Sequence, residues 1–206
     1  MERYFITGIG TDVGKTIASA IVVEALQADY WKPIQAGDLN YSDTHKVKEL
    51  VSNEKSSFYD NTYALNTPMS PHAAAAIDGL KIDVNQIIEP DVKGPLVIEG
   101  AGGLLVPLND MQTVADLIKK NYKVILVSQH YLGSINHTLL TINELKNRGL
   151  QIGGLLFNGV ETPTTEEIIE KQGAVKIIGR IDHEQRVDKE MIRKYAQRFK
   201  QHLIDL

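Results

Sequence analysis

Short apolar runs alternate along the chain with longer segments whose apolar residues recur at helical spacing. This alternation is typical of an α/β fold with a parallel sheet. The apolar runs are mostly continuous, as expected for strands that are buried on both faces. The predicted strands are Tyr4–Ile6, Tyr30–Trp31, Pro95–Ile98, Lys123–Val127, Gly154–Phe157 and Val175–Ile178. We therefore predict a mostly parallel β-sheet flanked by helices on both faces.

Helical periodicity predicts five helices, at Lys15–Ala28, Val114–Asn121, Ile135–Arg148, Thr165–Gly173 and Val187–Leu203. The pair Ser70-Pro71 predicts the start of a further helix, because serine caps and proline favours the first turn. In the last helix, apolar residues recur every fourth position from Val187 to Phe199. Such a stripe is more typical of core packing than of a ligand site.

The chain shows no internal repeat, low-complexity segment or linker rich in Ser or Pro. Its least regular stretch, Asp38 to Asp60, is polar, and we expect a functional loop with a short helix there. We therefore predict a single domain that covers residues 1–206.

Composition excludes several classes of protein. Hydrophobic residues make up 43% of the 206 residues and charged residues 23%, which is typical of a globular protein. The absence of cysteine excludes disulfides, thiolate metal sites and a cysteine nucleophile. A net charge of −4 argues against a nucleic-acid partner, and no apolar run approaches the roughly 18 residues that span a membrane. Because no signal-peptide pattern follows Met1, a cytoplasmic location is expected.

The segment from Gly8 to Thr16, GIGTDVGKT, carries the clearest chemical signal. It follows the first predicted strand and opens the first predicted helix, as a phosphate-binding P-loop does. In that role Lys15 would reach the β- and γ-phosphates, and the Thr16 hydroxyl would ligate Mg²⁺. The spacing is unusual, because five residues rather than four separate Gly8 from Gly14. The alternative is a glycine-rich turn without a ligand.

Three charged residues suit phosphoryl transfer, which needs carboxylates for a metal and positive charge on the reacting group. Glu99 stands after an apolar strand before Gly100-Ala101-Gly102-Gly103, Asp43 opens the predicted short helix, and Lys32 follows Tyr30-Trp31. The alternative for Glu99 is a surface glutamate, that for Asp43 is a helix cap, and that for Lys32 is an ordinary exposed lysine.

Two further segments lie at predicted strand ends. Asn158-Gly159 follows a late strand, where a base should bind, although a simple turn is the alternative. The guanine-specific tetrapeptide Asn-Lys-x-Asp is missing, so adenine is preferred. Gly133 to His137 opens a helix whose free N–H groups suit a substrate carboxylate. The histidines show no metal-ligand spacing, so a structural role is expected for them.

Together these segments resemble the dethiobiotin synthetase family of the P-loop NTPase superfamily. The resemblance spans most of the chain, and the five-residue loop spacing is characteristic of this family. Its segments, in family order, are Thr7–Thr16, Trp31–Gln35, Ser70–Ala73, Ile98–Leu104, Gly133–His137 and Phe157–Gly159. Such enzymes are ATP-dependent cyclo-ligases. The resemblance therefore implies a Mg²⁺-dependent homodimer that acts on ATP, CO₂ and 7,8-diaminononanoate, with its active site at the subunit interface.

The resemblance also implies roles for individual residues. Lys15, Lys32 and Thr11 would be catalytic, with Thr11 and Lys32 also contacting substrate. The carboxylate of the substrate would be bound by Gly133, Ser134, Ile135 and Asn136 of the partner subunit. Metal would be held by Thr16, Asp43 and Glu99. The nucleotide and its metal would be bound by Asp12, Val13, Gly14, Lys15, Thr16, Ile17, Asp43, Glu99, Gly100, Ala101, Gly102, Asn158 and Gly159.

Two positions depart from the family pattern. Ala36 replaces a usual Ser or Thr, and Asp182 replaces a proline near the base, which should loosen nucleotide preference.

A ParA/MinD-like ATPase switch needs a second lysine where this chain has Gly10. A glutamine-dependent amide ligase needs a cysteine nucleophile, unless a separate subunit supplies the glutaminase.

Overall fold

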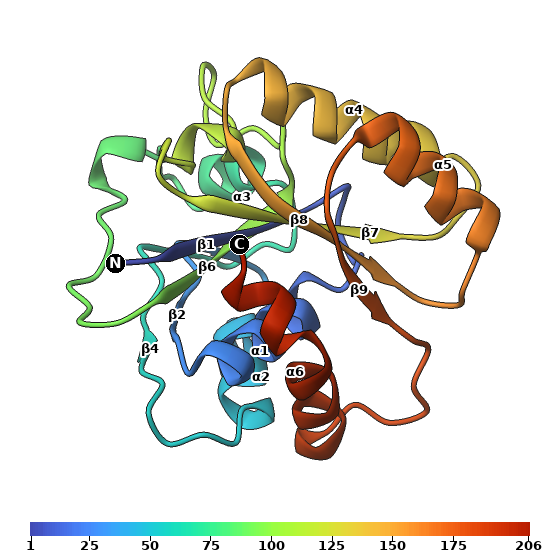
Figure 1. The fold of residues 1–206 in the computed structure, drawn as a ribbon. Coiled ribbons are helices and arrows are strands. Elements are labelled where there is room, and N and C mark those ends of the chain that lie inside the picture. Colours follow the sequence, from blue (N-terminus) through green and yellow to red (C-terminus); the bar gives the residue numbers. More distant parts are fainter.

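Seven parallel strands form the main sheet in the computed structural model, which describes residues 1–206 (Figure 1). Their order across the sheet is β4-β2-β6-β1-β7-β8-β9. Every neighbouring pair is parallel, so all carboxyl ends lie at one edge. The bounds are β1 Arg3–Gly8, β2 Asp29–Trp31, β4 Phe58–Tyr59, β6 Leu96–Gly103, β7 Lys123–Gln129, β8 Gln151–Asn158 and β9 Ile177–Ile181.

Helices cover both faces of this sheet, as predicted. Helices α1 (Lys15–Leu26), α2 (Asp43–Leu50) and α6 (Lys189–Ile204) lie on one face, and α4 (Ser134–Asn147) and α5 (Pro163–Gly173) lie on the other (Figure 1). Both layers are needed because the central strands are buried on both faces. The predicted short helix in the irregular loop is confirmed as α2.

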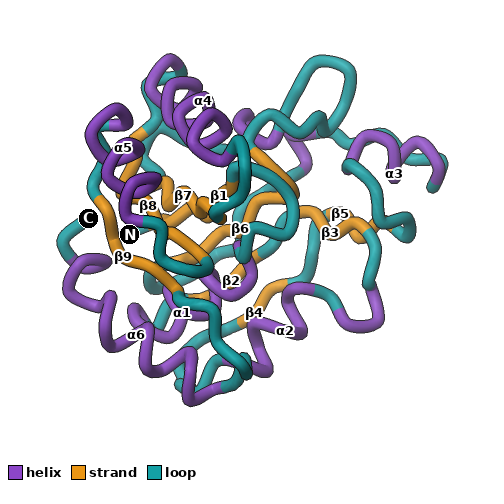
Figure 2. The backbone as a smooth tube through the Cα atoms, turned by 90° about the vertical axis from the view of Figure 1, so that its right-hand side faces the viewer, coloured by secondary structure: helices purple, strands orange, loops and turns teal.

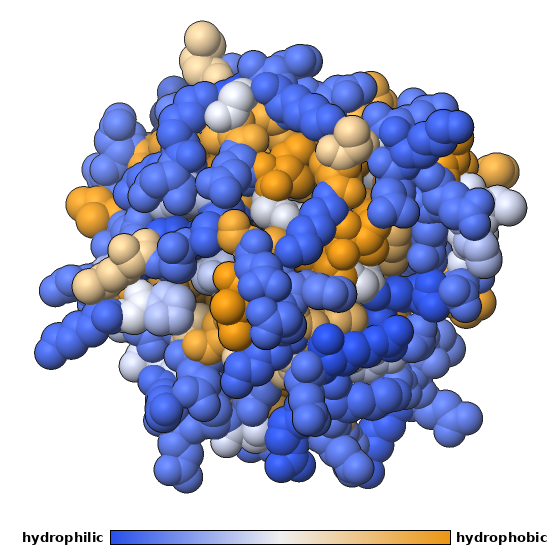
Figure 3. Space-filling model, viewed as in Figure 1, coloured by the Kyte–Doolittle hydropathy of each residue, from blue (hydrophilic) through white to orange (hydrophobic).

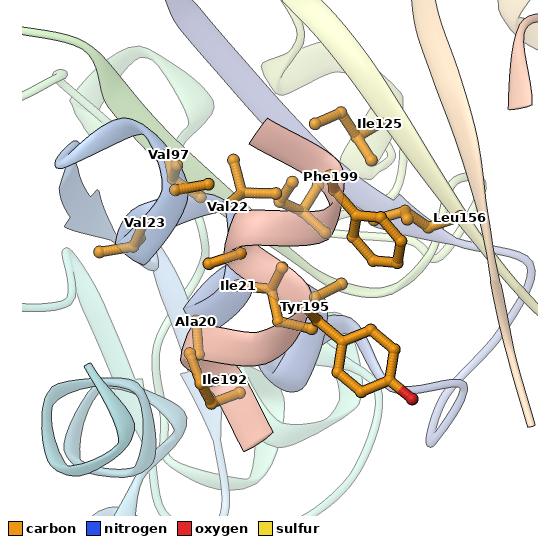
Figure 4. Packing of buried hydrophobic residues seen from close by; sticks show 14 of the residues in the cluster. Ala20, Ile21, Val22, Val23, Val97, Ile125, Leu156, Ile192, Tyr195 and Phe199 are labelled. Atoms are coloured by element: carbon orange, nitrogen blue, oxygen red, sulfur yellow. The ribbon is translucent and has the colours of Figure 1, made fainter. Parts of the chain in front are cut away.

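The C-terminal helix packs its apolar stripe against α1 and the sheet. Tyr195 and Phe199 of α6 are almost fully buried, and Figure 4 shows them facing Ile21 of α1. Val97, Ile125 and Leu156 close the same cluster from the sheet side. Met191, Tyr195 and Phe199 of the predicted stripe are therefore core packing, as their spacing indicated. Val187, the first residue of that stripe, was wrongly included, because it precedes α6 and is 46% exposed.

A second sheet of two strands lies beside the main one and was not predicted. Strands β3 (Ile34–Ala36) and β5 (Tyr63–Leu65) pair in parallel, and helix α3 (Pro71–Ile77) lies close to them (Figure 2). Strands this short leave no periodic pattern in a sequence. The start of α3 at Pro71, after the N-cap Ser70, agrees with the sequence prediction.

Three local predictions were wrong. The segment Val114–Asn121 is not a helix, since only Val114–Leu117 forms a single 3₁₀ turn. The last strand begins at Ile177 rather than Val175. The strand predicted at Pro95–Ile98 begins at Leu96 and continues through the glycines after Glu99 to Gly103. Without side chains, this end of β6 lets the backbone of the loop after β1 approach, and a Cβ on Gly103 would come within 3.4 Å of Gly10. The two remaining 3₁₀ turns are Leu39–Tyr41 and Val84–Gln86.

The surface seen in Figure 3 is largely hydrophilic, with hydrophobic residues gathered near its centre. None of the helices combines the length and apolar character that crossing a lipid bilayer demands.

Candidate active site

The loop between β1 and α1 has the backbone conformation that its glycines allow. Gly14 precedes α1 at φ +95°, in the left-handed region that favours glycine. A Cβ on Gly14 would lie 2.4 Å from Asn158 Nδ2, so a larger residue is also excluded by space. Asn158 donates a hydrogen bond from Nδ2 to the Val13 carbonyl, at 3.0 Å. The end of β8 therefore supports the loop directly.

Lys15, the first residue of α1, folds back across this loop. Its Nζ donates to the Gly10 carbonyl at 2.8 Å, and the residue is only 7% exposed. Burial lowers the pKa of Lys15 to about 8, although the negative charge of Glu99 opposes the shift. The ammonium is thus held at the centre of the loop, where the N-terminus of α1 adds further positive potential.

Lys32, Asp43 and Glu99 form one buried ion cluster. Lys32 Nζ lies 2.5 Å from Asp43 Oδ2 and 2.9 Å from Glu99 Oε1. Burial would lower the pKa of Lys32, but the two carboxylates raise it above its ordinary value. Burial alone would raise the pKa of Asp43, and Lys32 instead lowers it. Lys32 is therefore an ammonium that pairs with both carboxylates.

The fold explains why these three residues meet. Strands β2 and β6 are neighbours with Trp31 opposite Ile98, so Lys32 and Glu99 follow at the same level. Asp43 begins α2, whose N-terminus is capped by the Ser42 side chain in a capping box with His45. The parallel register and the helix cap thus bring together residues that are far apart in the chain.

The oxygen atoms around Lys32 fit a magnesium ion. Thr16 Oγ1 lies 3.1 Å from Glu99 Oε1. The Thr16 hydroxyl and the carboxylates of Asp43 and Glu99 therefore converge on the place that the Lys32 ammonium occupies. No group of three or more His, Cys, Asp or Glu side chains is arranged so that it could hold a metal ion. Magnesium bound through one or two carboxylates, with phosphate and water oxygens, needs no larger group.

These residues line a single cavity of about 720 Å³. Its wall includes eleven of the residues predicted from the sequence, namely Thr11, Asp12, Gly14, Lys15, Thr16, Ile17, Lys32, Asp43, Glu99, Ala101 and Gly102. Ala36 also lines the cavity, at the end of β3. The Ser or Thr hydroxyl usual at this position would therefore lie at the wall of the same cavity.

Other predicted residues lie outside the cavity wall. Val13 is buried beneath the loop, and Gly100 lies within β6, where a Cβ would come within 3.1 Å of Phe5. Asn158 ends β8 and Gly159 follows it, and the Gly159 N–H donates to the Ile181 carbonyl at 2.8 Å. Asp182, the next residue, accepts from Arg180 at 3.0 Å. The predicted base-binding residues thus form a separate group beside the loop.

The segment Gly133–Asn136 lies at the start of α4, after β7, and does not line the cavity of its own chain. Ser134 is buried, whereas Gly133, Ile135 and Asn136 are exposed. The neighbouring Leu132 is fully exposed and Leu140 is 58% exposed. Exposed apolar side chains therefore lie beside the N-terminus of α4.

Sequence reasoning missed three residues that contact the ion cluster or its supports. Tyr30 donates to Glu99 Oε2 at 2.9 Å, and Lys46 Nζ lies 3.3 Å from Asp43 Oδ1. Gln35 Oε1 accepts from the Asp43 N–H at 3.3 Å. Tyr30 had been interpreted only as part of an apolar strand. The sole available signal was the one-turn spacing of Asp43 and Lys46 on a helix.

The fold and this loop define the class of the protein as a P-loop nucleotide-binding protein. A family model described as an AAA domain matches residues 2–191. The chain is 61% identical to the ATP-dependent dethiobiotin synthetase BioD of Christiangramia forsetii, with 100% of this chain and 99% of that protein covered. It is 49% identical to the protein of the same name from Cytophaga hutchinsonii, with 95% and 96% covered. The chain therefore belongs to the ATP-dependent dethiobiotin synthetase family.

Solved structures of other proteins share the fold. A ParA family ATPase from Chlorobium tepidum superposes with a TM-score of 0.59 at 12% identity, covering 99% of this chain and 96% of that one. The septum site-determining protein MinD of Pyrococcus horikoshii, in complex with Mg-ADP, gives 0.58 at 16% identity, covering 99% and 95%. At such low identity the likeness concerns the fold alone.

Proposed function

We propose that this protein closes the cyclic urea of dethiobiotin from 7,8-diaminononanoate and CO₂ at the expense of ATP, in biotin biosynthesis. The observation that carries the proposal is the convergence of Lys15, Lys32, Asp43 and Glu99 on one cavity beside a phosphate-binding loop. Membership of the dethiobiotin synthetase family supplies the reaction to which this arrangement is assigned.

The reaction has three balanced steps. One amine of the substrate adds to the carbon of CO₂ and releases a proton, giving a carbamate. A carbamate oxygen attacks the γ-phosphorus of ATP, and ADP leaves, giving a carbamic–phosphoric mixed anhydride. The second amine then attacks the carbamate carbon, loses a proton and expels inorganic phosphate, which closes the five-membered ring.

Lys15 and the loop amides bind the phosphates, and Lys15 stabilises the charge on the transferred γ-phosphoryl group. Thr11 and Asp12 line the cavity beside Lys15, close to where that group would lie. Lys32 orients the carbamate by charge, since an ammonium at this depth is a strong partner for an anionic oxygen. Asn158 and Gly159 are assigned to adenine because they flank the loop at the end of β8.

Thr16, Asp43 and Glu99 would hold Mg²⁺, which would neutralise charge on the β- and γ-phosphates. For this to happen Lys32 must share or leave its present partners, because its ammonium lies between the two carboxylates. Displaced toward the cavity, Lys32 is available to the carbamate. Metal binding and substrate orientation are therefore linked through this one side chain.

A homodimer completes the site in this proposal. Gly133 to Asn136 lie at the same edge of the sheet as the loop, but they are exposed and outside the cavity of their own chain. The first amides of α4 suit a carboxylate. Asn136 of the partner subunit would therefore clasp the carboxylate of the diamine, with the exposed Leu132 contributing to the subunit contact.

The test is ADP release from Mg²⁺-ATP and bicarbonate, measured with and without 7,8-diaminononanoate, together with mass spectrometry of the product. Diamine-dependent ADP release with the mass of the cyclic urea is the expected result. ATP turnover that ignores the diamine would contradict the proposal and favour a nucleotide-driven switch.

A further inference from the structure

Tyr30 supports the carboxylate of Glu99 from inside the protein. The Tyr30 side chain has no exposed surface, and its hydroxyl donates to Glu99 Oε2 at 2.9 Å. Tyr30 is not part of the cavity wall, and it contacts the Glu99 oxygen that neither Thr16 nor Lys32 contacts. Its hydroxyl therefore acts on the site only through this carboxylate.

The parallel register sets this contact. Tyr30 on β2 lies opposite Val97 on β6, and Glu99 follows two residues later on the same face. Long side chains reach such a diagonal neighbour. The Tyr30 ring packs in the core on the α1 side and lies 6.2 Å from the Phe58 ring, centroid to centroid. The position of the phenol oxygen is consequently determined by the core.

Each oxygen of the Glu99 carboxylate has a distinct set of partners. Oε1 accepts from Thr16 at 3.1 Å and from Lys32 at 2.9 Å, whereas Oε2 accepts from Tyr30 alone. The terminal torsion of a glutamate is broad, so packing alone does not orient its carboxylate.

We propose that Tyr30 is a positioning residue that holds Glu99 Oε2 toward the core and presents Oε1 to the divalent cation of the nucleotide complex. This inference rests on the proposed magnesium site. Partners that orient a metal-ligating side chain typically change metal affinity when they are removed. Tyr30 would thus set metal affinity without touching metal, nucleotide or substrate.

The test compares the Mn²⁺ affinity of Tyr30→Phe with that of wild type. Binding is monitored by electron paramagnetic resonance in the presence of a non-hydrolysable ATP analogue. We expect the Mn²⁺ dissociation constant to rise about 10-fold in Tyr30→Phe. Phenylalanine keeps the ring and therefore the packing, so affinity for the analogue without metal should stay at the wild-type value.

The matched control is Tyr122→Phe. Tyr122 also donates its hydroxyl to a carboxylate, Glu89 Oε2, but far from the cavity described above. Both variants should lose some thermal stability, and only Tyr30→Phe should lose Mn²⁺ affinity. Equal Mn²⁺ affinity in Tyr30→Phe and wild type would overturn the positioning role while leaving the metal site in place. Failure of the wild type itself to bind Mn²⁺ with the analogue would overturn the metal site, and this inference with it.

Discussion

Replacing Lys32 with Met should unbalance the ion cluster at the centre of the cavity. Methionine matches the length of the lysine stem but leaves Asp43 and Glu99 without their shared cation. The Glu99 side chain is fully buried and that of Asp43 is 19% exposed, so the two negative charges would face each other in a poorly solvated site. Breaking a buried ion pair costs about 3–5 kcal/mol, and the partial exposure of Asp43 favours the lower end.

A loss of about 3 kcal/mol should lower the melting temperature by roughly 6–12 °C in a chain of this size. We expect this loss in urea and thermal unfolding with EDTA present. Adding Mg²⁺ should restore roughly half of the lost stability, because a ligand that binds only the folded state stabilises it by about 1.4 kcal/mol at roughly tenfold its dissociation constant. Wild-type protein should respond weakly to Mg²⁺ alone, since Lys32 competes for the same oxygens.

The matched control is Lys46→Met. Lys46 pairs with Asp43 at 3.3 Å and lies 5.9 Å from the centre of the Tyr41 ring, and its side chain is 34% exposed, so its loss should cost about 1 kcal/mol. If Lys32→Met had the same unfolding free energy as the control, the ion pairs of Lys32 with the two carboxylates would not stabilise the fold. An identical Mg²⁺ response in Lys32→Met and wild type would show that Lys32 and the metal do not compete.

The remaining predictions concern catalysis, substrate binding and acid stability. Lys15→Ala should lower turnover on the order of 10³-fold, measured as product formation, because the lysine charge matters most in the transition state; near-normal turnover would exclude Lys15 from the mechanism. Asn136→Ala should raise the KM for the diamine in steady-state kinetics, and an effect on ATP affinity alone would refute its placement. Hydrogen bonds from Tyr122, Arg3 and Lys119 outweigh the effect of burial and lower the pKa of Glu89 from 4.5 to about 2. This carboxylate therefore stabilises the fold above its ordinary pKa, and urea unfolding should show that stability being lost as pH falls from 4.5 toward about 2. Glu89→Gln should show a smaller loss over that range.

Local signals in the sequence were sufficient for the architecture and for the phosphate-binding loop. Continuous apolar runs predicted the central parallel strands. The glycines from Gly8 to Gly14 predicted the loop, because the left-handed backbone conformation found at Gly14 favours glycine. The four-residue spacing in the last helix likewise predicted that Met191, Tyr195 and Phe199 pack in the core. In each case the signal lies within a few neighbouring residues, and burial periodicity or backbone freedom links it to structure.

Only the tertiary structure decided which polar groups meet. The Lys32 ammonium between Asp43 and Glu99, and the Tyr30 hydroxyl behind Glu99, depend on the register of β2 against β6, and no local pattern encodes that register. The weak strands β3 and β5 and the single turn at Val114 were missed or misjudged because short elements take their form from tertiary contacts. Sequence thus determined the kinds of side chain available for the chemistry, whereas packing determined their partners, protonation and orientation.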